Sequence, residues 1–133
     1  MEEKLIAMAR QAMERAYAPY SRFQVGAALL CADGSIYTGC NVENASYGAT
    51  NCAERTAFFK AVSDGKREFT AIAIVGGPHG QIQGLCPPCG ICRQVMAEFC
   101  QDDFRIILAD GAGVYRKAGL SELLPLHFSA ENL

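Results

Sequence analysis

The sequence predicts an α/β fold in which a mixed β-sheet is covered by helices. Continuously apolar stretches indicate buried strands, and segments with apolar residues three and four positions apart indicate amphipathic helices. The two kinds of segment alternate along the chain, as in layered α/β proteins. The 133 residues contain no internal repeat and no long linker, so we expect a single domain over residues 1–133.

The expected elements follow one another with few gaps. In chain order they are a helix over 3–17, strands over 23–31 and 35–40, an irregular Asn-rich stretch over 41–51, a helix over 52–63, a strand over 69–75, a helix over 90–99, strands over 105–109 and 114–117, and a short helix over 120–124. Pro19 and Pro125 end two of the helices, because proline cannot continue a helix. Asp33-Gly34 is a strong hairpin signal between the first two strands. Asp64-Gly65 ends the second helix, and Gly76-Gly77-Pro78 breaks the third strand.

Composition and charge exclude several classes of protein. Half of the residues are apolar, which excludes intrinsic disorder. The net charge of −2 gives no general attraction to nucleic acid or to an anionic membrane. No span approaches the roughly 20 apolar residues of a membrane helix, and the acidic start Met1-Glu2-Glu3 is unlike a signal peptide. We therefore expect a cytoplasmic protein.

Seven cysteines then need an explanation, because disulfides are disfavoured in a reducing compartment and clustered thiols there more often bind metal. Cys52 opens the second predicted helix, and Cys89 and Cys92 lie at the start of the third. Exposed N–H groups at a helix start favour thiolate. Thiolates select zinc or iron–sulfur clusters, and three of them leave the fourth zinc position for water, as in catalytic sites.

Glu54 has two possible roles. It fits the third position of a capping box with Asn51 as the N-cap. It also fits a proton carrier beside a zinc-bound water, facing a substrate. Helix positions two apart point to different sides, so Glu54 is not expected to share the metal with Cys52. The spacing alone does not choose between the two roles.

Cys52-Ala53-Glu54 followed by Pro88-Cys89-Gly90-Ile91-Cys92 resembles the zinc-dependent deaminase signature. The segments 20–28, 41–48 and 123–128 resemble those of cytidine deaminases of the small homotetrameric type, so the likeness spans nearly the whole chain. It implies a three-layer α/β/α fold with a mixed five-stranded sheet. It also implies hydrolytic deamination of cytidine and deoxycytidine to the uridine forms and ammonia, in pyrimidine salvage, with one Zn²⁺ per chain and active sites shared within a homotetramer.

The same resemblance assigns roles to individual residues. It makes Cys52, Cys89 and Cys92 the zinc ligands and Glu54 the proton shuttle of a zinc-bound hydroxide. The implied nucleoside contacts are Phe23, Asn41, Glu43 and the backbone of Ala53, and Tyr47 and Phe128 are implied to complete a site shared between subunits.

Two of these assignments have a physical basis in the sequence. Three thiolates with Zn²⁺ sum to −1, which opposes ionisation of the water, and Arg55 is the nearby cation that could draw charge off the sulfurs. Asn41 and Glu43 are alternate residues of an extended segment, so both can point at one ligand, and an amide beside a carboxylate suits ribose hydroxyls. The plainer alternatives are that Arg55 is a surface arginine and that Asn41 and Glu43 belong to a solvated polar loop. For Phe23 the plainer alternative is a position in the core.

Other functions stay open at this point. Deaminases of a cytosine-containing antibiotic such as blasticidin S share the two cysteine motifs, although Asn41-Val42-Glu43 favours a plain nucleoside. A non-enzymatic module with a closed four-cysteine zinc site would use Cys86 as its fourth ligand. Cys86, Cys89 and Cys92 also match part of an iron–sulfur run, but Met96 stands where the next cysteine would fall.

Overall fold

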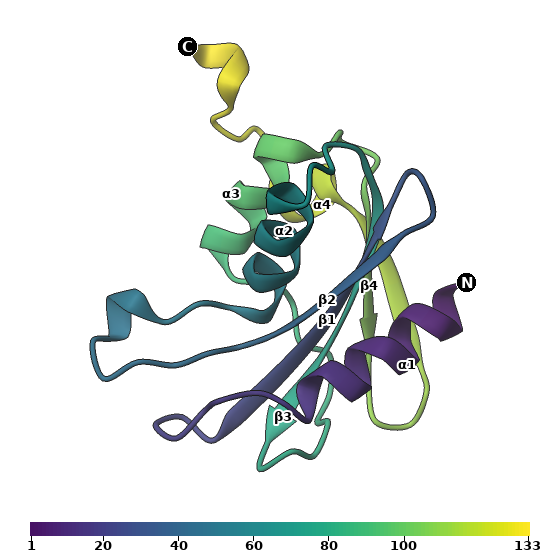
Figure 1. Cartoon of the computed structure of the whole chain (residues 1–133). Helices are drawn as coiled ribbons and strands as arrows, with labels where there is room; N and C mark the ends of the chain where they lie inside the picture. The colour runs from purple at the N-terminus through teal and green to yellow at the C-terminus, as the bar shows by residue number, and fades with distance from the viewer.

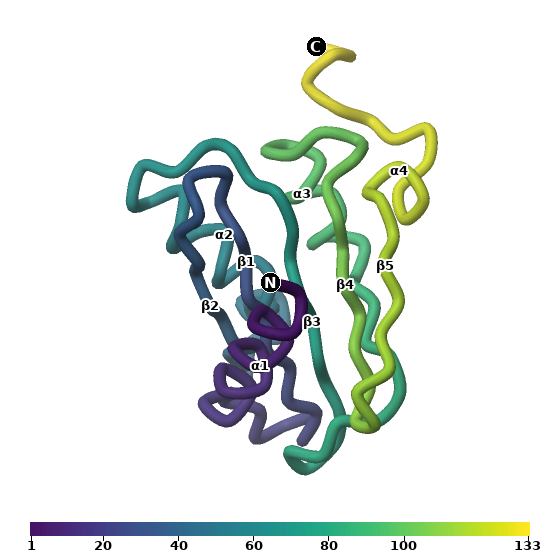
Figure 2. Tube along the Cα trace, turned by 90° about the vertical axis from the view of Figure 1, so that its right-hand side faces the viewer, coloured from purple at the N-terminus to yellow at the C-terminus, as the bar shows by residue number.

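The computed structural model describes all residues, 1–133, as a five-stranded sheet with helices on both faces. The strands are β1 (Phe23–Cys31), β2 (Ile36–Cys40), β3 (Phe69–Pro78), β4 (Arg105–Ala109) and β5 (Tyr115–Gly119). The helices are α1 (Glu2–Met13), α2 (Ala53–Ser63), α3 (Gly90–Phe99) and α4 (Leu120–Leu123), with 3₁₀ turns η1 (Tyr47–Ala49) and η2 (Ala130–Asn132). Figure 2 shows the strand order β2-β1-β3-β4-β5. Only β3 and β4 run parallel, which confirms a mixed sheet.

Two apolar cores hold the three layers together. Helix α1 lies alone on one face of the sheet, and α2, α3 and α4 cover the other (Figure 1). Leu5 and Met13 of α1 pack in one core with Val75 of β3. Phe58 of α2 and Met96 of α3 are fully buried in the other core. Successive side chains of the strands enter opposite cores, as the pleat of a sheet requires. The predicted α/β/α architecture is confirmed.

Two element boundaries near the chain ends differ from the predictions. Helix α1 ends at Met13 rather than at residue 17. The chain turns there, and the backbone N–H of Tyr17 donates to the carbonyl of Asn41 at 2.9 Å, so the prediction for 14–17 was wrong. Strand β5 covers 115–119 rather than 114–117. Val114 instead closes the preceding turn, because its N–H donates to the carboxylate of Asp110 at 3.0 Å.

Strand β3 is three residues longer than the sequence predicts. The turn-like Gly76-Gly77-Pro78 continues the strand, because these residues pair in antiparallel register with Val25, Gln24 and Phe23 at the start of β1. Tertiary pairing therefore overrides a local turn signal. The extension lies directly beside the first residues of β1, where the predicted nucleoside contact Phe23 is found.

Gly39 of β2 lets α2 approach the sheet closely. A Cβ at this position would lie 2.4 Å from the carbonyl oxygen of Ala53 and 2.6 Å from the backbone nitrogen of Ala57. Only glycine fits such an approach. The first turn of α2, with Cys52 before it and Glu54 within it, is thereby seated against the edge of the sheet. No helix of the chain combines the length and apolar character needed to cross a membrane.

Candidate metal centre and substrate site

Three cysteine thiols meet where two helices begin. Cys52 is the N-cap residue of α2, Cys89 is the N-cap residue of α3, and Cys92 lies on the first turn of α3. Their sulfur atoms all lie within 4.8 Å of one another. The separation is 3.8 Å between Cys52 and Cys89 and 3.6 Å between Cys89 and Cys92. The structure thus brings together the three residues that the sequence singled out.

The geometry of this thiol cluster fits a zinc ion. Sulfurs bound to one tetrahedral zinc at about 2.3 Å lie about 3.8 Å from each other, close to the observed separations. Soft sulfur donors favour zinc over magnesium or calcium. The N-terminal ends of α2 and α3 add backbone N–H groups and a positive dipole end, which stabilise thiolates. Cys86 is not in the cluster, so the chain offers three clustered sulfur ligands there and not the four of a closed structural site.

Charge in the cluster is balanced by Arg55. Its Nη2 donates to the sulfur of Cys52 at 3.2 Å, as predicted for a cation that draws charge from the thiolates. Hydrogen bonds from Cys92 and Arg55 lower the pKa of Cys52 well below its usual range, against the effect of burial. Burial opposes the charge of Arg55, but its bonds to the Cys52 and Cys92 sulfurs raise its pKa overall. Arg55 is thus half-buried and hydrogen-bonded to the cluster, unlike a free surface arginine.

Glu54 is buried beside the thiols, with 4% of its surface exposed. Burial raises its pKa to about 7, and the charge of Cys52 acts in the same direction. The capping-box alternative is wrong, because the N-cap residue is Cys52 and the Asn51 side chain instead donates to the hydroxyl of Thr56 at 3.0 Å. A carboxyl with a pKa near neutrality can both accept and release a proton at physiological pH.

Asn41 is the other buried polar side chain of the protein. It follows directly after β2 and continues the pairing of that strand with β1 through its amide. Its Oδ1 accepts from the N–H of Val25 at 2.9 Å, and its Nδ2 donates to the carbonyl of Phe23 at 2.8 Å. One N–H and one lone pair of the amide remain for a ligand. These two bonds therefore fix the orientation of the Asn41 amide and leave one donor and one acceptor able to hydrogen-bond a ligand.

Glu43 lies two residues further on and is held by the loop before β1. Its Oε1 accepts from the backbone N–H groups of Tyr20 and Ser21 at 2.9 and 3.0 Å, and its Oε2 accepts from the Ser21 hydroxyl. These bonds, above all the one from the Ser21 hydroxyl, lower the pKa of Glu43, so it is ionised at neutral pH. The carboxylate is thus a fixed acceptor with limited freedom to move.

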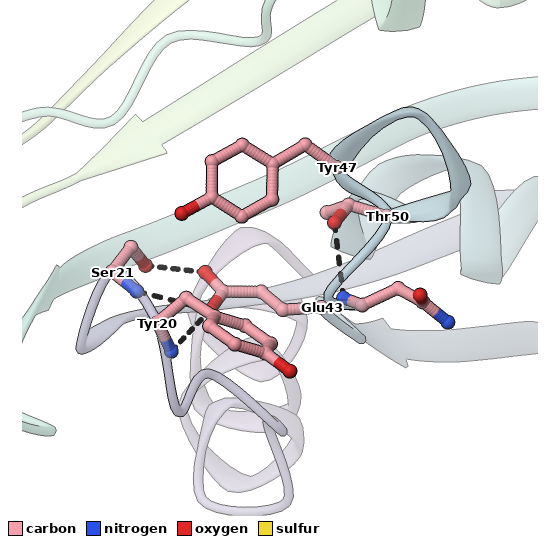
Figure 3. A pocket seen from close by; sticks show the side chains of 6 residues that line it. Tyr20, Ser21, Glu43, Tyr47 and Thr50 are labelled. Carbon is pink, nitrogen blue, oxygen red and sulfur yellow. Dashed lines mark hydrogen bonds between the residues drawn. The ribbon is translucent and has the colours of Figure 1, made fainter.

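A pocket of about 320 Å³ opens beside Glu43. Figure 3 shows the Glu43 carboxylate pointing to the Tyr20-Ser21 backbone, with the rings of Tyr20 and Tyr47 on either side of it. Those two rings meet edge to face with centroids 6.0 Å apart. The remaining lining residues are Asn44 and Thr50. A volume of this size is at the lower end of small-molecule sites, which run from about 300 to 1,000 Å³.

The other predicted contacts are found in different settings. Ala53 is fully buried as the first residue of α2, and Phe23 is 38% exposed at the start of β1. Tyr47 and Phe128 are largely exposed. The C-terminal segment that carries Phe128 extends from the top of the view in Figure 1, and the loop that carries η1 extends from the lower left. One chain therefore does not bring these two aromatic residues together.

Sequence reasoning gave no role to two residues that support the site. Ser21 donates hydrogen bonds to the Glu43 carboxylate from both its backbone N–H and its hydroxyl, although the two residues are distant in sequence. Arg93 donates from Nε to the carbonyl of Pro88 at 2.7 Å and from Nη1 to the carbonyl of Leu123 at 2.6 Å, which anchors the approach to Cys89. Ser21 lies in the 20–28 segment and Arg93 directly follows the Pro88–Cys92 motif, but both contacts depend on the tertiary fold and could not be inferred from these positions.

The thiol cluster and the buried carboxyl on an α/β/α framework fit the class of zinc-dependent hydrolases. A model of the "Cytidine and deoxycytidylate deaminase zinc-binding region" matches residues 1–108, and the chain belongs to this family. A cytidine deaminase of Sporosarcina psychrophila is 54% identical over 131 residues, covering 98% of this chain and 93% of that one.

A structure and a more distant relative place the chain within that family. The crystal structure of cytidine deaminase from Burkholderia pseudomallei superposes with a TM-score of 0.89 at 49% identity, covering 96% of this chain and 99% of that one. A blasticidin-S deaminase of Bacillus cereus is only 31% identical, over 82% of this chain and 79% of its own length. The similarity to the two cytidine deaminases described above is therefore both higher and more complete.

Proposed function

We propose that this protein is a cytidine deaminase that converts cytidine and deoxycytidine, with one water, to uridine and deoxyuridine and ammonia. The observation that carries the proposal is the buried Glu54 beside three thiols whose sulfurs lie within 4.8 Å. The relatives named cytidine deaminase at 54% identity support the choice of substrate. Pyrimidine salvage in the cytosol is the setting that we propose for this activity.

Cys52, Cys89 and Cys92 are the proposed zinc ligands. Zinc held there supplies a Lewis acid that lowers the pKa of a water from 15.7 to about 7. Arg55 keeps the negative charge of the sulfurs from opposing this effect, because it donates to Cys52 at 3.2 Å. The positive ends of α2 and α3 act in the same direction.

Glu54 moves the protons of the reaction. Its carboxylate accepts a proton from the attacking water and passes it to N3 of the pyrimidine. The water oxygen bonds to C4, Glu54 carries the second proton of that oxygen to the exocyclic amine, the C4–N bond breaks, and ammonia leaves while the C4–O group becomes a carbonyl. Burial suits this role, because it raises the pKa of Glu54 to about 7 and lets it give and take a proton near neutral pH.

The nucleoside is held by the residues around the first part of β1. Asn41 keeps one donor and one acceptor free, and Glu43 is an ionised acceptor, so together they suit the ribose hydroxyls. Phe23 is the proposed apolar contact of the base, and the backbone of Ala53 the proposed polar one. Binding of the sugar positions C4, which contributes to rate as well as to affinity.

We also propose a homotetramer in which chains share their active sites. Tyr47 is 75% exposed and Phe128 is 62% exposed, so both rings are accessible to a neighbouring chain. They lie on segments that extend away from each other (Figure 1). A neighbouring chain would bring its Phe128 to the pocket beside Glu43, which Tyr47 of the same chain already lines.

Exchange of Glu54 tests the proposed chemistry. Glu54→Gln keeps the size of the side chain but removes its ability to accept a proton, so kcat for cytidine should fall by about 10²–10⁴. Zinc content should stay at the wild-type level, because this residue is not a proposed ligand. Turnover is followed by the loss of cytidine absorbance, and metal is measured on the same sample. A near-normal rate in this variant would remove Glu54 from the mechanism.

A further inference from the structure

The extension of β3 creates a small space over Gly76 in which two side chains meet. A Cβ at Gly76 would lie 2.9 Å from the sulfur of Cys86 and 3.2 Å from Cε1 of Phe23. It would also lie 3.2 Å from the carbonyl of Gln24. The thiol of Cys86 and the ring of Phe23 therefore converge on the same point of the β3 surface, and the absence of a side chain at Gly76 leaves them room.

The thiol of Cys86 stays protonated, because burial raises its pKa and the charges of Glu54 and Cys52 act in the same direction. The side chain is half-buried against the core that α2 and α3 share. A protonated cysteine in such a place behaves as a small apolar group. Cys86 thus presents a small apolar group to the space over Gly76 that the ring of Phe23 also approaches.

We propose that Cys86 and Gly76 position the ring of Phe23, and thereby set how tightly the site holds the pyrimidine base. The inference rests on the proposed function, in which Phe23 contacts that base. Phe23 is 38% exposed, so its open side is free for a ligand while its packed side rests over Gly76. Because protein interiors are close-packed, a change in the volume behind the ring changes where the ring lies.

The first test removes the sulfur. Cys86→Ala should raise KM for cytidine about five-fold, equivalent to about 1 kcal/mol of binding. The kcat should stay within about two-fold and zinc content should not change, because Glu54 and the three ligand thiols are untouched. Cys86→Val, which restores an apolar group of similar size, should return KM to near the wild-type value. A role for the thiol as a ligand or reactive group would not allow this rescue.

Cys100→Ala is the matched control. Cys100 is also a half-buried thiol packed against the same core, but it follows the end of α3, away from Phe23. Its replacement should lower Tm to a similar degree while KM for cytidine stays unchanged. An equal rise of KM in both variants would show a general loss of packing and would overturn the positioning role of Cys86.

The second test is a double-variant cycle. Gly76→Ala places a methyl group against the sulfur and the ring, and should also raise KM. Adding Cys86→Ala to this variant removes the closest contact, so the double variant should have a lower KM than Gly76→Ala alone. The inference would be contradicted if the effects of the two substitutions on KM simply multiplied in the double variant. An unchanged KM in the Cys86→Ala variant, with a wild type that turns over cytidine, would contradict it as well. Absence of turnover in the wild type would instead contradict the proposed function.

Discussion

Burial of polar groups in this chain is concentrated at the proposed site. Asn41 and Glu54 are the only buried side chains of the protein that are polar or charged. Burial of such groups costs free energy unless they are hydrogen-bonded. Asn41 offsets the cost through two bonds to β1, whereas Glu54 responds with a pKa raised to about 7. In the proposed reaction, the fixed amide of Asn41 binds the ribose and the raised pKa of Glu54 suits proton transfer.

The residues proposed to hold ribose lead to a prediction about two substrates. Glu43→Gln weakens the acceptor for a hydroxyl, so kcat/KM for cytidine should fall by about 10² or more, with a much smaller effect on free cytosine. In the wild type, cytosine should be a very poor substrate. Rates are measured well below saturation for both enzymes and both substrates. Equal losses on the two substrates would mean that Glu43 only supports the loop.

Asn41 and Ser21 extend this comparison. Asn41→Ala should show the same substrate dependence but also lower the stability by about 1–3 kcal/mol, because it leaves two β1 backbone groups unpaired. Ser21→Ala is the milder control, since Glu43 keeps both backbone N–H bonds.

How far the sequence predicts the site depends on the kind of contact. Cys52, Cys89 and Cys92 could be predicted because their motifs place thiols at helix starts, and spacing alone excluded Glu54 as a co-ligand of Cys52. The hydrogen bonds from Ser21 to Glu43 and the approach of both Cys86 and Phe23 to Gly76 could not be predicted. Each joins segments that are distant in sequence and meet only through the pairing of β1 with its neighbours.

At the scale of elements, the position of α2 is what brings Cys52 to α3. This position depends on Gly39, which lets the first turn of α2 rest on β2. Gly26 has a comparable relation to α1 on the opposite face, where a Cβ would lie 2.0 Å from the carbonyl of Ala9. The same substitution at Gly39 and at Gly26 therefore displaces a different helix in each case. Only one of these helices, α2, carries residues of the site.

Gly39→Ala and Gly26→Ala should both lower the free energy of unfolding, by about 1–3 kcal/mol as expected for overpacking. Only Gly39→Ala should also weaken zinc binding and lower kcat, because it displaces the helix that carries Cys52 and Glu54. Denaturant unfolding and titration with a zinc chelator measure the two effects. Equal zinc affinity in the two variants would show that the position of α2 against β2 does not control the metal centre.

Element types were predicted well, but boundaries depended on tertiary pairing. The strand 23–31 and the helix 90–99 match the structure because strong local patterns agree with the fold. The end of β3 did not match, since Gly76-Gly77-Pro78 has the composition of a turn but pairs with β1. That same pairing brings the ring of Phe23 to Gly76, so the least predictable boundary of the sheet lies at the proposed base contact.

At the scale of the whole molecule, the proposed homotetramer predicts that one chain completes the site of another. Co-expression of Glu54→Gln and Phe128→Ala chains tests this. In mixed oligomers, a site with Glu54 from one chain and Phe128 from its neighbour is intact, so activity should exceed the sum of the two single variants. The pair Glu54→Gln and Cys89→Ser, whose defects lie in the same part of the site, should give a smaller recovery. Strictly additive activity in the first mixture would contradict sharing through Phe128.

The central claim is that the thiol cluster and Glu54 form a working deaminase centre. The most direct measurement follows the absorbance of cytidine and the release of ammonia with the purified wild-type protein, and determines zinc in the same sample. We expect one zinc per chain and stoichiometric formation of uridine and ammonia, with activity lost on chelation and restored by zinc. A protein that holds one zinc per chain and leaves cytidine and deoxycytidine unchanged would contradict the account.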